Sequence, residues 1–324
     1  MSVLKSLAFD EICQRRAIRS RDVTKLRGLF LANDLVTKDE ILGLLEINRA
    51  CIVHDDTWSD FLGDAIVDFT VRDLEPSGYI TSDNATWLIQ AMAPDGRIAT
   101  RTLLRVLPRM MTAARWVPVS LTLFAIEQVR LAVLDGRGPL RTGADVAPAH
   151  LIDGDADFIA SVLGTQPADR PVLISTTELE ALIATDCLAE HRSDAWTALL
   201  QCLIAAAAMR ASGWQTVGRY AVLNAPVWAD DPVTDAVFLS VLIGEGCSDP
   251  IAQADHEPML ERLERQRIEI ITGEPLHDLA APALAALLST ARPTLARGLV
   301  RVVDAGVALH PAFGPVVARD SKAA

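Results

Sequence analysis

Oxygen-bearing side chains recur in the twelve residues from Asp73 to Asn84, at loop positions one, three, five and nine, and position six is a glycine. Carboxylate and hydroxyl oxygens around a glycine turn are ligands that Ca²⁺ accepts, and Mg²⁺ also prefers oxygen. Position twelve is Asn84, where a glutamate would close a calcium shell with two oxygens. The loop is therefore a candidate Ca²⁺ or Mg²⁺ site with an incomplete ligand set, and a plain structural turn is the alternative. The candidate ligands are Asp73, Glu75, Ser77, Thr81 and Asp83.

Two further candidate metal ligands, Glu40 and Glu178, have the opposite defect. Each supplies a closing carboxylate but lacks an acidic run before it. Each also follows a hydroxyl residue by three positions, Thr37 and Ser175 respectively, which is the spacing of a helix capping box. The sequence predicts capped helix starts here and leaves ion contact as the alternative.

Four places share one local pattern: a turn, an apolar residue, a small residue and then a new helix. The pattern resembles the helix–loop–helix of EF-hand proteins, which implies short helix pairs that position the candidate ligands. The four places are 34–37, 78–81, 96–99 and 172–175.

The same pattern also resembles the tellurite-resistance B family of small all-α modules. The resemblance covers Val23–Val71 and, more weakly, Phe158–Met209. It implies a binding or scaffolding role connected with metal-ion stress, in which Glu40 and Glu178 would contact the ion.

Two tryptophans lie in segments that align without a gap, because 196 − 58 = 138 and the same offset places Leu35–Ile66 on Leu173–Ile204. Trp58 and Trp196 are followed at helical spacing by apolar residues, which predicts core positions for both. Asp56 and Asp194 precede them by two residues, and we expect both to be N-caps rather than a pair of acids. An internal duplication of one helical module follows from this register.

Apolar residues recur at helical spacing almost throughout the chain, which predicts an all-α fold with short EF-hand-like turns between helices. The best single helix is Ser120–Leu134, followed by the Gly- and Pro-rich stretch Asp135–Pro148. We therefore expect a first helical module at residues 1–140 and a second at 149–324, with an irregular insertion at about 212–232.

The chain has 324 residues and a net charge of −12, which disfavours nonspecific nucleic-acid binding. Met1–Arg27 nevertheless carries seven positive and three negative side chains, so its net charge is +4. This segment is a candidate contact for an anionic membrane surface or a protein partner, with a solvated helix as the alternative. The arginines proposed for this contact are Arg15, Arg16, Arg19 and Arg21.

Five cysteines without Cys-x-x-Cys spacing fit reduced thiols, and we find no secretory cleavage pattern and no apolar run of about 20 residues. The sequence predicts a cytoplasmic protein. Cys51 lies near His54, but its acidic neighbourhood favours a small core residue over a nucleophile. The six histidines are scattered, so a multi-histidine metal site requires tertiary assembly.

Phosphate-binding loops, zinc-protease helices and nucleophile elbows are missing from the sequence. We therefore expect no enzyme activity, no resident cofactor and a non-enzymatic binding or scaffolding role toward an unknown protein partner. A module responsive to Ca²⁺ or Mg²⁺ is the first alternative, and an enzyme with an unrecognised site is the second.

Overall fold

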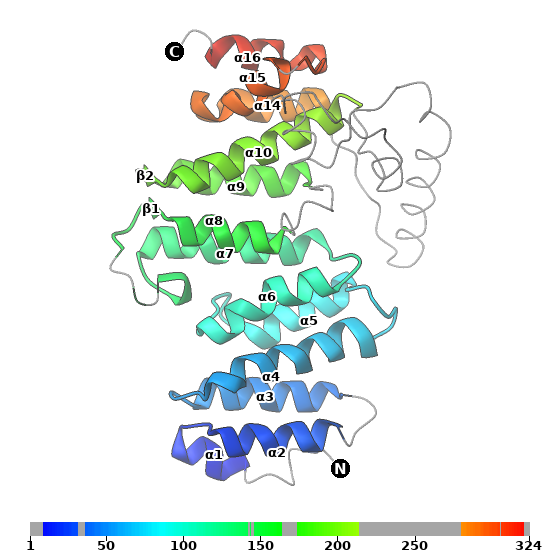
Figure 1. Cartoon of the computed structure of the whole chain (residues 1–324), viewed down its shortest axis with the longest axis vertical. Helices are drawn as coiled ribbons and strands as arrows, with labels where there is room; N and C mark the ends of the chain where they lie inside the picture. Colours follow the sequence, from blue (N-terminus) through cyan, green and yellow to red (C-terminus); the bar gives the residue numbers. More distant parts are fainter. Residues whose placement is uncertain are drawn as a thin grey trace, which may run out of the picture. The chain divides into compact units, whose positions relative to one another are not determined.

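The computed structural model describes residues 9–31, 36–141, 143, 146–163, 174–213, 280–304 and 306–320, and this part of the chain is mostly helical (Figure 1). The expected all-α class is confirmed. The irregular insertion expected at 212–232 lies almost wholly outside the described residues. No described helix has both the length and the apolarity needed to cross a bilayer.

The chain divides into two compact units, Met1–Pro148 and Ala149–Ala324. In the first unit α4 packs against α2 and α6, and α5 packs against α7. The elements of this unit are α1 (Phe9–Arg15), α2 (Ser20–Leu31), α3 (Lys38–Ala50), α4 (Asp56–Val67), η2 (Asp68–Asp73), α5 (Ser82–Met92), α6 (Arg101–Ala113), α7 (Val119–Asp135) and η3 (Pro139–Arg141).

In the second unit α10 packs against α8, α14 and α15. Gly298 permits the contact with α15, because a Cβ there would lie 2.3 Å from the Gln201 carbonyl oxygen. The described elements are β1 (His150–Leu151), α8 (Asp153–Val162), α9 (Thr176–Leu188), β2 (His191–Arg192), α10 (Asp194–Ala211), α14 (Ala281–Thr290), η4 (Pro293–Ala296), α15 (Arg297–Asp304), η5 (Pro311–Phe313) and α16 (Gly314–Asp320).

Several helix ends follow from local sequence. Thr37 and Ser175 cap α3 and α9 through complete capping boxes, and Gly136 ends α7 in the left-handed conformation with φ 62°. The predicted start of α7 was wrong by one residue. This helix begins at Val119 after Pro118, and Ser120 makes no cap.

The expected N-caps Asp56 and Asp194 were also wrong by one residue. Asp55 caps α4 by accepting from the Thr57 N–H, and Ser193 caps α10 by accepting from the Trp196 N–H. Asp56 and Asp194 instead occupy the first helical position, where a carboxylate favours the positive end of the helix dipole.

Short parallel backbone contacts join loops at three places in the described residues. Ala17 bridges Val53, Tyr79 bridges Trp116, and His150 in β1 pairs with His191 in β2. We call each of these contacts a paired loop. Each joins the segment before one helix to the segment that links the next two helices, so it fixes three successive helices to one another.

Candidate functional site

Glu40 and Glu178 are occupied as helix caps. The Thr37 N–H donates to Glu40 Oε2 at 2.9 Å, and the Ser175 N–H donates to Glu178 Oε2 at 2.7 Å. Both carboxyl side chains are buried. The structure therefore supports the capping interpretation of these two residues, and their contact with an ion stays a prediction.

The candidate ligands between Asp73 and Asn84 also have protein partners. Asp73 Oδ2 accepts from the Val36 N–H at 3.0 Å, and Thr81 Oγ1 accepts from the Asn84 N–H at 3.3 Å as the N-cap of α5. Glu75 Oε2 accepts from the Ser77 N–H at 3.4 Å, while Asp83 lies exposed in the first turn of α5.

Across the described ranges, no three His, Cys, Asp or Glu side chains gather where they could hold a metal ion. Calcium or magnesium binding by this loop stays a prediction.

The two aligned tryptophans are fully buried, which confirms their predicted core positions. Trp58 Nε1 donates to Asn48 Oδ1 at 3.0 Å, and Trp196 Nε1 donates to Asp186 Oδ1 at 3.1 Å. Both acceptors lie ten residues before their tryptophan. Our sequence interpretation missed Asn48 and Asp186, although the offset of 138 residues places one on the other.

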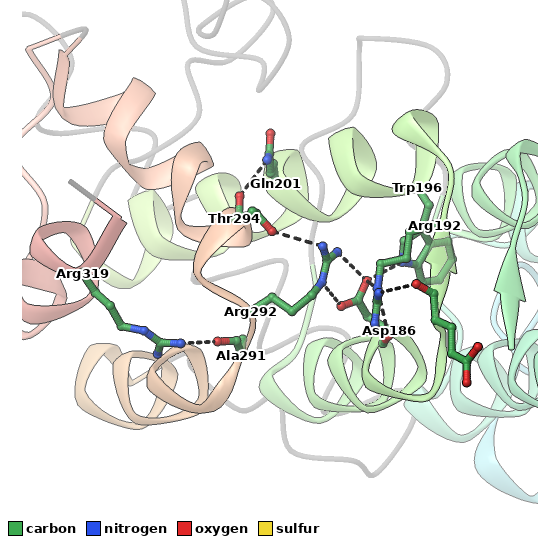
Figure 2. Close-up of polar contacts among 9 residues, drawn as sticks. Asp186, Arg192, Trp196, Gln201, Ala291, Arg292, Thr294 and Arg319 are labelled. Carbon is green, nitrogen blue, oxygen red and sulfur yellow. Dashed lines mark hydrogen bonds and ion pairs between the residues drawn. The ribbon is translucent and has the colours of Figure 1, made fainter. Parts of the chain in front are cut away.

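Asp186 is the centre of a polar cluster in the second unit (Figure 2). Arg292 donates to it with two nitrogens, Nε to Oδ2 at 2.6 Å and Nη2 to Oδ1 at 2.7 Å. Arg192 donates from Nε to Oδ1 at 3.2 Å and from Nη2 to the Asp186 carbonyl oxygen at 2.6 Å. The Asp186 carboxylate has no exposed area, and its ion pairs with two arginines supply the partners that burial of a charge requires.

The same cluster holds the segment Ala291–Thr294 in place (Figure 2). Arg292 Nη1 donates to Thr294 Oγ1 at 3.1 Å, Gln201 Nε2 donates to the Thr294 carbonyl oxygen at 2.8 Å, and Arg319 Nη2 donates to the Ala291 carbonyl oxygen at 2.9 Å. Every one of these polar groups contacts another part of the protein. The cluster is therefore built to join α9, α10, η4 and α16.

The environments of Cys51 and His54 do not favour a reactive thiolate with a neighbouring imidazole base. Burial, followed by the charge effect of Cys13, raises the pKa of the Cys51 thiol. Burial also lowers the pKa of the His54 imidazole, whose Nε2 has no hydrogen-bond partner in the described structure. Since a raised pKa keeps the thiol protonated, the structure supports the interpretation of Cys51 as a small core residue.

The N-terminal arginines separate into two groups. Arg15 is half-buried and forms an ion pair with the buried Asp22, so it is structural. Arg16, Arg19 and Arg21 are exposed, although Arg21 Nε lies 3.9 Å from Asp22 Oδ1.

Ile52 and Val53 lie next to Arg16 and are 69% and 62% exposed, and both donate their backbone N–H to the Arg16 carbonyl oxygen. They are the most exposed large apolar side chains among those described. We define the basic-apolar surface as Arg16, Arg19, Arg21, Ile52 and Val53.

Comparisons with family models, curated proteins and solved structures found no match to this chain.

Proposed function

We propose that this chain is a non-enzymatic scaffold that mediates protein–protein interaction and is built from three copies of one three-helix module. The copies would comprise α2–α4, α5–α7 and α8–α10. The paired loops carry this proposal, because a left-handed residue and two backbone hydrogen bonds recur in all three, and a further bond recurs in two.

Each paired loop begins with a residue in the left-handed conformation: Arg16 at φ 53°, Gly78 at φ 88° and Ala149 at φ 60°. This conformation is uncommon for a residue with a side chain, so its recurrence at Arg16 and Ala149 is informative. The carbonyl oxygen of each accepts an N–H from the opposite loop, at 2.9, 2.8 and 2.8 Å from Ile52, Arg115 and Glu190.

The hydrogen bonds that follow also correspond. Ile18 donates to the Val53 carbonyl oxygen at 3.0 Å, and Ile80 donates to that of Trp116 at 3.1 Å. In the first and third paired loops the next bond runs from Asp55 to Ile18 and from Ser193 to Leu151, at 3.1 and 3.0 Å. The second has Pro118 at that place, and proline has no N–H to donate.

Each proposed copy has two interior residues ten positions apart, and these two residues differ together from copy to copy. Asn48 with Trp58 in the first and Asp186 with Trp196 in the third are hydrogen-bonded polar pairs. At the corresponding places of the second module, Met111 and Leu121 are both buried and apolar. A buried tryptophan N–H needs a hydrogen-bond acceptor, whereas leucine has no side-chain N–H. Replacement of both residues together therefore leaves no buried polar group without a hydrogen-bond partner.

Repeated helical modules of this kind present extended surfaces for partners. The partner that we propose has an acidic surface with an apolar centre, because the basic-apolar surface combines three exposed arginines with Ile52 and Val53. Charge complementarity would orient the partner, and burial of the two aliphatic side chains would contribute affinity. The basic-apolar surface is positively charged, whereas the whole chain has a net charge of −12.

A comparative pull-down from the native host tests the proposal. Full-length tagged protein is compared with Arg16→Glu/Arg19→Glu and with Ile52→Ser/Val53→Ser. Leu134→Ser is the matched control, because Leu134 is 44% exposed but lies at the end of α7.

We expect the same proteins to be retained by the parent and the control and lost from both double variants. Retention by all four would contradict the proposal. Flotation with vesicles of anionic lipid tests whether the surface binds a membrane instead. If the parent binds the vesicles, both double variants do not, and the pull-down shows no protein lost from the variants, the surface is assigned to a membrane.

A further inference from the structure

β1 and β2 place two histidines that are 41 residues apart in the sequence directly beside each other. His150 and His191 are register partners in this parallel pair, and their ring centroids lie 4.5 Å apart with an angle of 33° between the ring planes. His191 is exposed and His150 is half-buried. The imidazoles therefore form a side-by-side pair that solvent can reach.

The backbone at this place does not require histidine. The corresponding pairs in the other two paired loops are Ala17 with Val53 and Tyr79 with Trp116. One backbone arrangement thus carries an aliphatic pair, an aromatic pair and an imidazole pair. The paired-loop backbone therefore accepts side chains of different size and polarity, and it does not itself select histidine.

We propose that His150 and His191 together bind a divalent transition-metal ion of the zinc class. Neutral imidazole nitrogen is a preferred ligand for Zn²⁺, Ni²⁺ and Cu²⁺, at about 2.0–2.1 Å from zinc. Two nitrogens of a tetrahedral site lie about 3.3 Å apart at that bond length. Coordination by both rings requires rotation of the side chains until one nitrogen of each faces the ion, and the paired strands already hold the ring centroids 4.5 Å apart. Water fills the remaining coordination positions.

The charge next to the pair suits a cation. Arg192 follows His191 directly, but its guanidinium is bound to the Asp186 carboxylate, which also pairs with Arg292, so these three side chains together keep one positive charge. Glu190, on the other side of His191, is exposed, as are Asp153 and Asp194 near the ends of the two strands. The surroundings of the imidazole pair are thus acidic on balance, which favours binding of a divalent ion.

Calorimetric titration of the reduced, tag-free full chain with ZnCl₂ at pH 7.5 tests the proposal. The principal variant is His150→Ala/His191→Val, which installs the pair found in the first paired loop. Cys187→Ser is the control, because it removes an exposed thiol on α9 and keeps both histidines. MgCl₂ serves as the oxygen-preferring comparison ion.

We expect one zinc ion fewer per chain in the double variant than in the parent, an unchanged site in Cys187→Ser and no corresponding heat with Mg²⁺. An equal zinc stoichiometry and affinity in parent and double variant, with matching thermal denaturation curves, would overturn the proposal, as would a parent that takes up no zinc. If the double variant does not fold, the single change His191→Asn at the exposed position decides. Loss of a ligand should weaken this site at least as much as loss of an outer-shell partner, which is about ten-fold or more, and unchanged affinity would reject the site.

Discussion

Trp196 donates its indole N–H to the fully buried carboxylate of Asp186 at 3.1 Å. The corresponding donor 138 residues earlier, Trp58, uses the side-chain oxygen of Asn48 at 3.0 Å. The acceptor of Trp58 is a neutral amide, whereas the acceptor of Trp196 is a carboxylate. Asp186 can be a buried carboxylate because Arg292 and Arg192 form ion pairs with it.

The buried tryptophans should each contribute several kcal/mol to stability. Trp58→Ala and Trp196→Ala remove a large buried side chain and leave a cavity, so each should lower the free energy of unfolding by about 3–5 kcal/mol. Denaturant titration followed by circular dichroism measures the change. Val53→Ala, at a largely exposed position, should remain within about 0.5 kcal/mol of the parent. A tryptophan variant as stable as this control would contradict the core assignment.

The ion pairs of Asp186 should be strongly coupled to the fold. Asp186→Asn keeps an oxygen for Trp196, as Asn48 does, but leaves two arginines without their carboxylate. The free energy of unfolding should fall by about 3 kcal/mol, because the surviving charges remain partly buried. Asp64→Asn is the control, since the pair between Asp64 and Arg109 is exposed and should contribute about 0–1 kcal/mol. A double-mutant cycle with Arg292→Met should show coupling; additive losses would disprove it.

His54 should make stability depend on pH. Burial holds the pKa of its imidazole below the usual value of about 6.5, so the folded state binds a proton less readily than the unfolded state. The stabilising contribution is complete above pH 6.5 and is lost as the pH falls through the lower folded-state pKa. The free energy of unfolding of the parent and of His54→Gln, measured between pH 5 and 7.5, should converge at the acid end. Parallel curves would exclude His54 as the titrating group.

Asn84→Glu distinguishes a capped turn from a calcium loop. The new glutamate lies three residues after Thr81, the spacing of the capping boxes at Thr37–Glu40 and Ser175–Glu178. We expect a gain of roughly 0.5–1 kcal/mol in stability without added calcium. Neither the parent nor the variant should then change its melting temperature when Ca²⁺ is added. Calcium-dependent stabilisation of the variant alone would instead support an EF-hand-like geometry, and tight binding by the parent would refute the structural turn.

The two units should fold separately. The helix η3 packs against α6 and α7, and Arg141 is buried, so a cut between 137 and 147 would damage the first unit. Fragments 1–148 and 149–324 should both be soluble and helical by circular dichroism. A pair of unfolded fragments would show that the two units depend on each other.

Features that depend on neighbours within one or two helical turns could be predicted from the amino-acid sequence. Apolar spacing predicted an all-α chain, and Thr37, Ser175 and Gly136 predicted real helix ends, because a cap satisfies backbone groups only a few residues away. The burial of Trp58 and Trp196 also followed from local apolar spacing. The one-residue errors at Asp56 and Asp194 arose because Asp55 and Ser193 are equally competent caps, and local patterns choose poorly between adjacent candidates.

Tertiary structure alone decided which distant side chains meet. Arg292 lies 106 residues from Asp186, and no periodic pattern connects them. The pairing of His150 with His191 likewise depends on how a loop before α8 aligns with the loop after α9. In the proposed second copy, α5–α7, the interior pair is Met111 and Leu121, and two buried apolar residues give no signal in the sequence that distinguishes this segment from other helices. The three paired loops share backbone hydrogen bonds while their side chains differ, so the sequence gives little sign that these contacts are alike.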